Sequence, residues 1–122
     1  MENLNIEESK LSPRIEMNVS GDCKITGVSR PEDPKTFFKP VFDWLDSFFE
    51  AKSAPLNLSV ELNYFNTSSS KVLLDIFEKL EENKDEVDVK VVWIYEEDDD
   101  ELLDAGEELL DLVEIEYELR EV

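Results

Sequence analysis

The chain changes its hydrophobic period within residues 56–77, "LNLSVELNYFNTSSSKVLLDIF". From Leu56 to Tyr64, apolar and polar residues alternate, which is the pattern of a β-strand with one buried face. From Leu73 onward, apolar residues recur at spacings of three and four, as on the buried face of an α-helix. The stretch therefore predicts a strand followed directly by a helix, with four consecutive hydroxyl residues, 67–70, at the junction.

The same two periods recur along the rest of the chain. Alternation on both sides of "SGD", residues 20–22, predicts a short hairpin. Helical spacing predicts two further helices, at residues 37–49 and 96–112. Alternating or apolar runs predict two further strands, at residues 87–95 and 113–119. Strands that alternate with helices imply crossovers and mainly parallel pairing. We expect one α/β domain over residues 1–122, with a mixed sheet, an N-terminal hairpin and three packed helices, preceded by a polar tail at 1–12.

Details of these segments leave three points open. The polar residues between 57 and 63 suggest that the helices leave one face of the sheet partly uncovered. Pro40 lies within the first helical pattern, so it either kinks the helix or marks its first turn. Gly106 either weakens the third helix by roughly 1 kcal/mol or allows another group to pack closely against it.

Composition limits the possible partners. The net charge is −20, from 32 acidic and 12 basic residues, and there is no cluster of Lys and Arg. Because binding to a phosphate backbone depends on such clusters, nucleic acids and anionic membranes are poor partners. A field of this sign favours a basic protein partner, although it would equally serve solubility alone.

Other classes are disfavoured by what the chain lacks. It has no apolar run of the roughly 20 residues that a membrane helix needs, and its acidic start does not resemble a secretory signal. Cys23 is the only cysteine, so no internal disulfide can form, and a cytoplasmic location is expected. There is no histidine to act as a general base or to activate Cys23, and there is no glycine-rich phosphate loop. We therefore expect no enzymatic activity and no cofactor.

The acidic run "EEDDDE", residues 96–101, has two interpretations. It lacks the glycine and the ligand spacing of an EF-hand loop, so no metal site is assigned. Acidic residues at a helix start interact favourably with the positive end of the helix dipole, and Asp98 or Asp99 can cap the third helix. A small acidic protein that binds a divalent ion weakly is the alternative.

The hydroxyl cluster after the central strand also has two interpretations. Asn66 or Thr67 can cap the following helix by accepting a backbone N–H bond, but one cap suffices. A helix N-terminus also favours anions. A phosphoryl group on Thr67, or alternatively Ser68, would meet N–H donors there, and Lys71 lies one turn further on. The residues alone leave capping and phosphorylation both open.

Three segments together resemble a known family. "YFNTSSSKVLLDIFEKLEE" (64–82) resembles the signature of the SiaC family of bacterial regulatory phosphoproteins. "GVSRPEDPKTFFKPVFDWL" (27–45) is similar to that family's G-x-S-x-P-E loop and the helix after it. "WIYEEDDDELLDAGEE" (93–108) resembles its acidic segment. The three occur in the family's order and cover about residues 13 to 110. Arg30 stands where the family's loop is expected to carry an aromatic residue.

The resemblance implies a fold and a function. The expected fold is similar to that of STAS domains, the fold of anti-sigma-factor antagonists. The function is a non-enzymatic switch whose Thr67 is phosphorylated by a partner kinase and restored by a PP2C-type phosphatase. The unphosphorylated form is expected to bind and activate a diguanylate cyclase, with Asn66, Ser68, Ser69 and Lys71 on the docking surface. An anti-sigma kinase, as for ordinary STAS antagonists, is the alternative partner.

Overall fold

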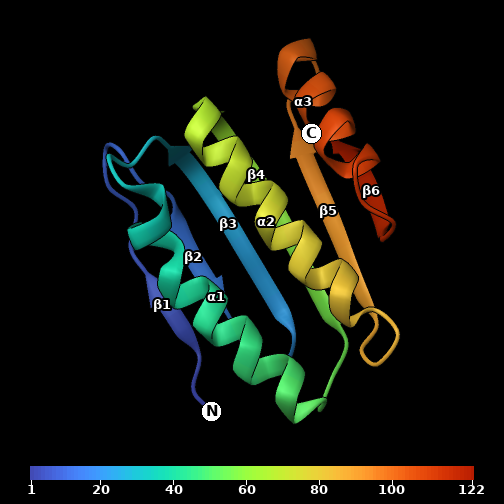
Figure 1. Cartoon of the computed structure of the whole chain (residues 1–122). Helices are drawn as coiled ribbons and strands as arrows, with labels where there is room; N and C mark the ends of the chain where they lie inside the picture. Colours follow the sequence, from blue (N-terminus) through green and yellow to red (C-terminus); the bar gives the residue numbers. More distant parts are fainter.

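The computed structural model describes all 122 residues and contains six strands and three helices (Figure 1). They follow the chain as β1 (Leu4–Ile6), β2 (Arg14–Met17), β3 (Asp22–Ser29), α1 (Pro34–Ala51), β4 (Leu56–Phe65), α2 (Thr67–Asn83), β5 (Val89–Tyr95), α3 (Asp100–Asp111) and β6 (Glu116–Glu121). The predicted succession of hairpin, helix, strand, helix, strand, helix and strand is confirmed.

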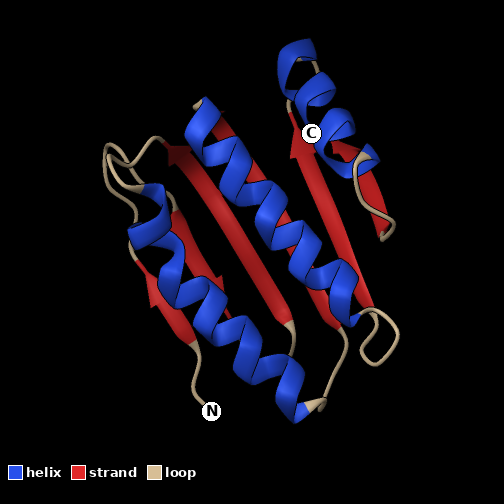
Figure 2. Ribbon diagram, viewed as in Figure 1, coloured by secondary structure: helices blue, strands red, loops and turns tan.

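The strands form one sheet in which spatial order equals chain order, from β1 to β6. The β1–β2 and β2–β3 pairs are antiparallel, and the three pairs from β3 to β6 are parallel. Each helix connects two neighbouring parallel strands. Because such crossovers share one hand, and the strand order never reverses, all three helices lie on the same face of the sheet (Figure 2). The mixed α/β sheet predicted from the sequence is therefore correct.

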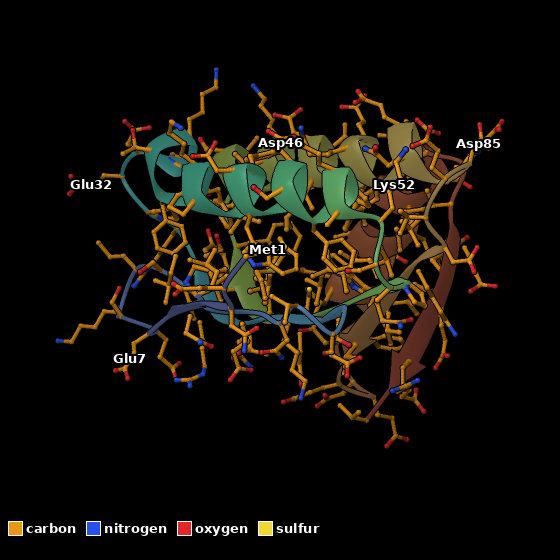
Figure 3. All side chains as sticks on the ribbon, turned by 90° about the horizontal axis from the view of Figure 1, so that it is seen from below. Met1, Glu7, Glu32, Asp46, Lys52 and Asp85 are labelled. Carbon is orange, nitrogen blue, oxygen red and sulfur yellow. The ribbon has the colours of Figure 1, made fainter.

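The core fills the space between the helical layer and the sheet (Figure 3). Leu58, Val60 and Leu62 of β4 are buried there, whereas Asn57 and Glu61, which point the other way, are exposed. The phenylalanine stripe of α1 is also mostly buried in this core. The expected open face of the sheet is thus confirmed. None of the helices combines the length and apolarity needed to span a membrane.

The N-terminal segment is more ordered than the sequence suggested. Residues 1–12 were expected to form a polar tail, but β1 pairs with β2 at the edge of the sheet. The Trp44 indole N–H also donates a hydrogen bond of 2.9 Å to the carbonyl of Glu2. Leu4 and Ile6 pack against the core, and two apolar residues are too few to define a period. The tail prediction is wrong for this strand.

Helix α1 begins earlier than its apolar pattern. Asp33 is the N-cap, its carboxylate accepting the Thr36 amide at 3.3 Å, and Pro34 is the first helical residue. The hydroxyl and amide of Thr36 hold the pKa of the Asp33 carboxyl below its ordinary value. Pro40 therefore lies in the helix interior and does not mark the first turn.

Gly106 lies against the indole ring of Trp93. A Cβ atom at this position would be 2.4 Å from the ring, closer than any side chain tolerates without displacement. Trp93 itself is buried, and its Nε1–H donates a 3.0 Å hydrogen bond to the carbonyl of Leu102 in α3. Of the two explanations for Gly106, the close approach of another group is the correct one.

Candidate functional site

The four hydroxyl residues form the start of α2, at the end of the sheet where the parallel strands β3, β4 and β5 have their C-termini (Figure 1). In parallel α/β sheets this end carries the loops that bind ligands and partners. Strand β4 runs into α2 with only Asn66 between them, so the first turn of the helix is joined to a rigid strand.

Asn66 is the N-cap of α2. Its side-chain oxygen accepts the backbone N–H of Ser69 at 2.9 Å, and its carbonyl accepts the N–H of Ser70 at 3.0 Å. Of the two caps that the sequence allowed, the structure selects Asn66, and Thr67 becomes the first helical residue. The backbone N–H groups of Thr67 and Ser68 are then among those that a helix start leaves without an intrahelical partner.

We expect Asn66→Ala to lower the free energy of unfolding by about 1 kcal/mol, because it removes the acceptor for the Ser69 amide. Urea titration would measure the change. Ser68→Ala is the matched control, since its side chain lies on the same turn but is exposed. Equal stability of the two variants would show that the cap does not contribute.

Two of the four hydroxyls are committed to internal hydrogen bonds. The Ser69 hydroxyl donates to the carbonyl of Ser29 at 2.9 Å and accepts the Ser29 hydroxyl at 2.8 Å. Ser29 and Ser69 are both fully buried and are the two buried polar residues of the chain. The Ser70 hydroxyl donates to the carbonyl of Thr67 at 2.7 Å. The hydroxyl cluster is therefore partly a structural device that joins α2 to the end of β3.

Thr67 and Ser68 differ from their two neighbours. Both are exposed, and neither hydroxyl takes part in the hydrogen bonds that hold this turn. They are the two exposed hydroxyl residues of the cluster. Ser69 was expected on a docking surface, but full burial prevents it from touching a partner, so that expectation is corrected. Asn66 is half-buried, and Lys71 is exposed and one turn along.

The acidic run before α3 serves the helix start. Asp99 is the N-cap, its carboxylate accepting the Leu102 amide at 3.0 Å, and Asp100 and Glu101 occupy the first turn. Of the two predicted caps, Asp99 is the one observed. The structure brings together no group of three or more His, Cys, Asp or Glu side chains suited to a metal ion.

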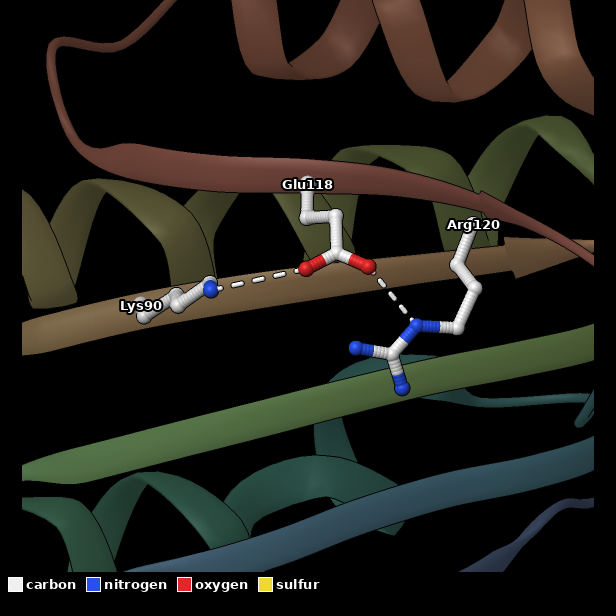
Figure 4. A network of polar contacts seen from close by, with 3 residues as sticks. All are labelled: Lys90, Glu118 and Arg120. Atoms are coloured by element: carbon white, nitrogen blue, oxygen red, sulfur yellow. Dashed lines mark hydrogen bonds and ion pairs between the residues drawn. The ribbon is translucent and has the colours of Figure 1, made fainter.

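Charged side chains on the open face of the sheet form surface networks. Glu118 of β6 contacts Lys90 of β5 at 3.5 Å and Arg120 at 2.7 Å (Figure 4). The hydrogen bond from Arg120 lowers the pKa of the Glu118 carboxyl, and Glu118 in turn raises the pKa of Arg120. Exposed pairs of this kind contribute little to stability. They give a structural role to these three charged residues of the uncovered face.

Cys23 has no place in a reactive site. Its side chain lies in the core, and burial raises the pKa of its thiol to about 12. The thiol is therefore protonated at neutral pH, and a protonated thiol is a poor nucleophile.

Comparison with known proteins identifies the family to which the chain belongs. The model of the SiaC family of regulatory phosphoproteins matches residues 6–122. The chain belongs to the SiaC family. An uncharacterized protein of Pseudomonas aeruginosa strain UCBPP-PA14 is 32% identical over 110 residues, which are 88% of this chain and 87% of that protein. The predicted family resemblance is confirmed over nearly the whole chain.

Solved structures agree with the SiaC fold. SiaC of P. aeruginosa superimposes with a TM-score of 0.90 at 30% identity, covering 100% of both chains. Its apo form gives 0.89 at 29% identity, covering 98% of this chain and 99% of that one. SiaC from the complex of the diguanylate cyclase SiaD with its activator SiaC gives 0.91 at 28% identity, with the same coverage. This SiaC-family chain therefore resembles the apo and complexed forms equally well.

Ser29 is the residue of this site that sequence reasoning missed. It lies 40 positions from its partner Ser69. A serine at the end of a strand carries no local sign of such a bond. The one available signal was the surplus of hydroxyls in 67–70, which capping alone did not explain.

Proposed function

We propose that the chain is a non-enzymatic switch that binds and activates a diguanylate cyclase while Thr67 is unmodified. Phosphorylation of Thr67 by a partner kinase ends the binding, and a PP2C-type phosphatase restores it. Family membership and the SiaC–SiaD complex from P. aeruginosa support the choice of partner class.

The observation that carries the proposal is the position of Thr67. It is exposed, it is the first residue of α2, and the turn around it is fixed by the Asn66 cap and the Ser29–Ser69 pair. A modifying enzyme therefore meets a defined surface rather than a flexible loop. We assign Asn66, Ser68 and Lys71 to the same docking surface because they lie on or beside this turn.

Binding is expected to require little rearrangement. The chain resembles apo-SiaC and SiaC bound to SiaD with nearly equal TM-scores of 0.89 and 0.91. Preorganised surfaces of this kind lose little conformational entropy on docking. Control then rests on the chemistry of the surface, which a phosphoryl group alters by about −1.5 to −2 charges.

The proposal predicts that the purified chain raises cyclic di-GMP formation by purified SiaD of P. aeruginosa. The rate with GTP would be measured with and without the chain, and Thr67→Ala would serve as a form that cannot be phosphorylated but still activates. Mass spectrometry of the chain recovered from its own cells should place a phosphoryl group on Thr67, or alternatively on Ser68. An absence of both activation and phosphorylation would contradict the proposal.

A further inference from the structure

Some of the positively charged side chains of this acidic chain form ion pairs and others do not. Seven of the 12 Lys and Arg residues form ion pairs, and these are Arg14, Lys39, Lys52, Lys79, Lys84, Lys90 and Arg120. The cations outside these pairs include Arg30 and Lys71, and both are exposed. With 32 acidic residues available, two unengaged cations near one turn call for an explanation.

Arg30 is held beside the first turn of α2 by the bonds of its neighbour Ser29. The Ser29 carbonyl accepts the backbone N–H of Asn66 at 3.1 Å and the Ser69 hydroxyl at 2.9 Å. The Ser29 hydroxyl donates to Ser69 at 2.8 Å. The backbone of Arg30, the residue that follows β3, therefore lies close to the backbone of Asn66, the N-cap of α2.

The backbone of Arg30 is also held by contacts other than those to α2. Its backbone N–H donates a 2.7 Å hydrogen bond to the carbonyl of Leu11, and the next residue, Pro31, is buried. The backbone of Arg30 thus has a defined place, while its long side chain remains exposed. Lys71 lies four residues after Thr67 in α2, and residues at this separation are neighbours on one helix face.

We propose that Arg30 and Lys71 together bind the phosphoryl group of phosphorylated Thr67 within the same chain. The planar guanidinium of Arg30 suits bidentate hydrogen bonding to phosphate oxygens, and the Lys71 ammonium supplies a second positive charge. In the unmodified protein Arg30 has no acidic partner and is available to a docking protein. Phosphorylation would therefore withdraw this cation from the docking surface as it adds negative charge. The inference rests on the proposed phosphorylation of Thr67.

The test uses the full chain carrying phosphothreonine at position 67, introduced during synthesis, so that no kinase is needed. Phosphorus NMR would follow the second ionisation of the phosphate, whose ordinary pKa is about 6. Because nearby cations favour the dianion, Arg30→Gln should raise this pKa by about half a pH unit, and Lys71→Gln should raise it less. Lys24→Gln is the matched control, since it removes one exposed, unpaired cation from β3 and should leave the pKa unchanged.

An identical titration in the parent protein and Arg30→Gln would overturn the inference, as would an equal shift in Lys24→Gln. Neither result depends on a partner, so the proposed function is tested separately by SiaD activation. If phosphothreonine had no effect on activation while Arg30→Gln still shifted the titration, the switch would fail and the intramolecular phosphate site would stand.

Discussion

Phosphothreonine at position 67 is expected to lower the affinity of the chain for SiaD of P. aeruginosa by about 100-fold or more. Thr67 is exposed at the start of α2, where a docked partner would cover it. Removing a dianion from water without full compensation costs several kcal/mol, and each 1.4 kcal/mol is about tenfold in affinity. Compensation by Arg30 and Lys71 within the chain would lessen the repulsion but would not restore the neutral surface. Calorimetric titration of SiaD with the modified and unmodified chains would measure the change.

Three variants sharpen this experiment. Thr67→Ala should bind as the unmodified chain does, because it adds no charge to the turn. Thr67→Asp should bind more weakly, but less so than phosphothreonine, since a carboxylate carries a smaller charge. Phosphoserine at position 68 tests the alternative acceptor on the same turn. The switch proposal would be wrong if phosphothreonine at 67 left the affinity for SiaD unchanged.

Gly21→Ala is expected to lower the free energy of unfolding by about 3 kcal/mol and the melting temperature by about 10 °C. Gly21 has a φ of +100°, which an L-residue with a side chain rarely adopts, and an added Cβ would lie 1.9 Å from the carbonyl oxygen of Pro55. Backbone atoms cannot turn aside as a side chain can. The Gly21 carbonyl also accepts the Asn57 amide at 2.8 Å, so displacement would loosen the start of β4.

Ser20→Ala is the control for this substitution. It adds no steric overlap next to Gly21, and the exposed Ser20 hydroxyl accepts only a long hydrogen bond of 3.5 Å from the Asp22 amide, so the melting temperature should stay close to that of the parent. Calorimetry would compare the three proteins. A melting temperature for Gly21→Ala within about 2 °C of the parent would show that the turn relaxes readily and that the estimate above is wrong.

The succession of elements was accessible from the sequence because each element carries its own period. Alternation in β4 and three-to-four spacing in α2 result from which side of a strand or helix faces the core. Where the local signal is short, prediction failed. β1 contains only Leu4 and Ile6 as apolar residues, and its pairing with β2 replaces the expected tail. The start of α1 at Pro34 was missed by several residues because the apolar stripe begins only at Phe37.

For the candidate site, the sequence limited the residues that could cap α2 or present an exposed hydroxyl, but it did not select among them. It offered Asn66 or Thr67 as the cap, and the structure selects Asn66. It offered four neighbouring hydroxyls of one chemical type, and only burial separates Ser69 from the exposed Thr67 and Ser68. Burial depends on what packs over a residue, and here that includes β3, far away in the sequence.

The sequence by itself determined the mixed sheet, the helices that follow its strands, the open polar face and the family to which the chain is similar. These follow from local periodicity and from motifs of neighbouring residues. Only the tertiary structure decided that Ser29 bonds Ser69, that Gly106 accommodates Trp93, and that the end of β3 at Ser29 bonds the Asn66 cap of α2. The physical reason is that each of these relations joins residues brought together by strand pairing or helix packing, and no local pattern records which distant segment will be the neighbour.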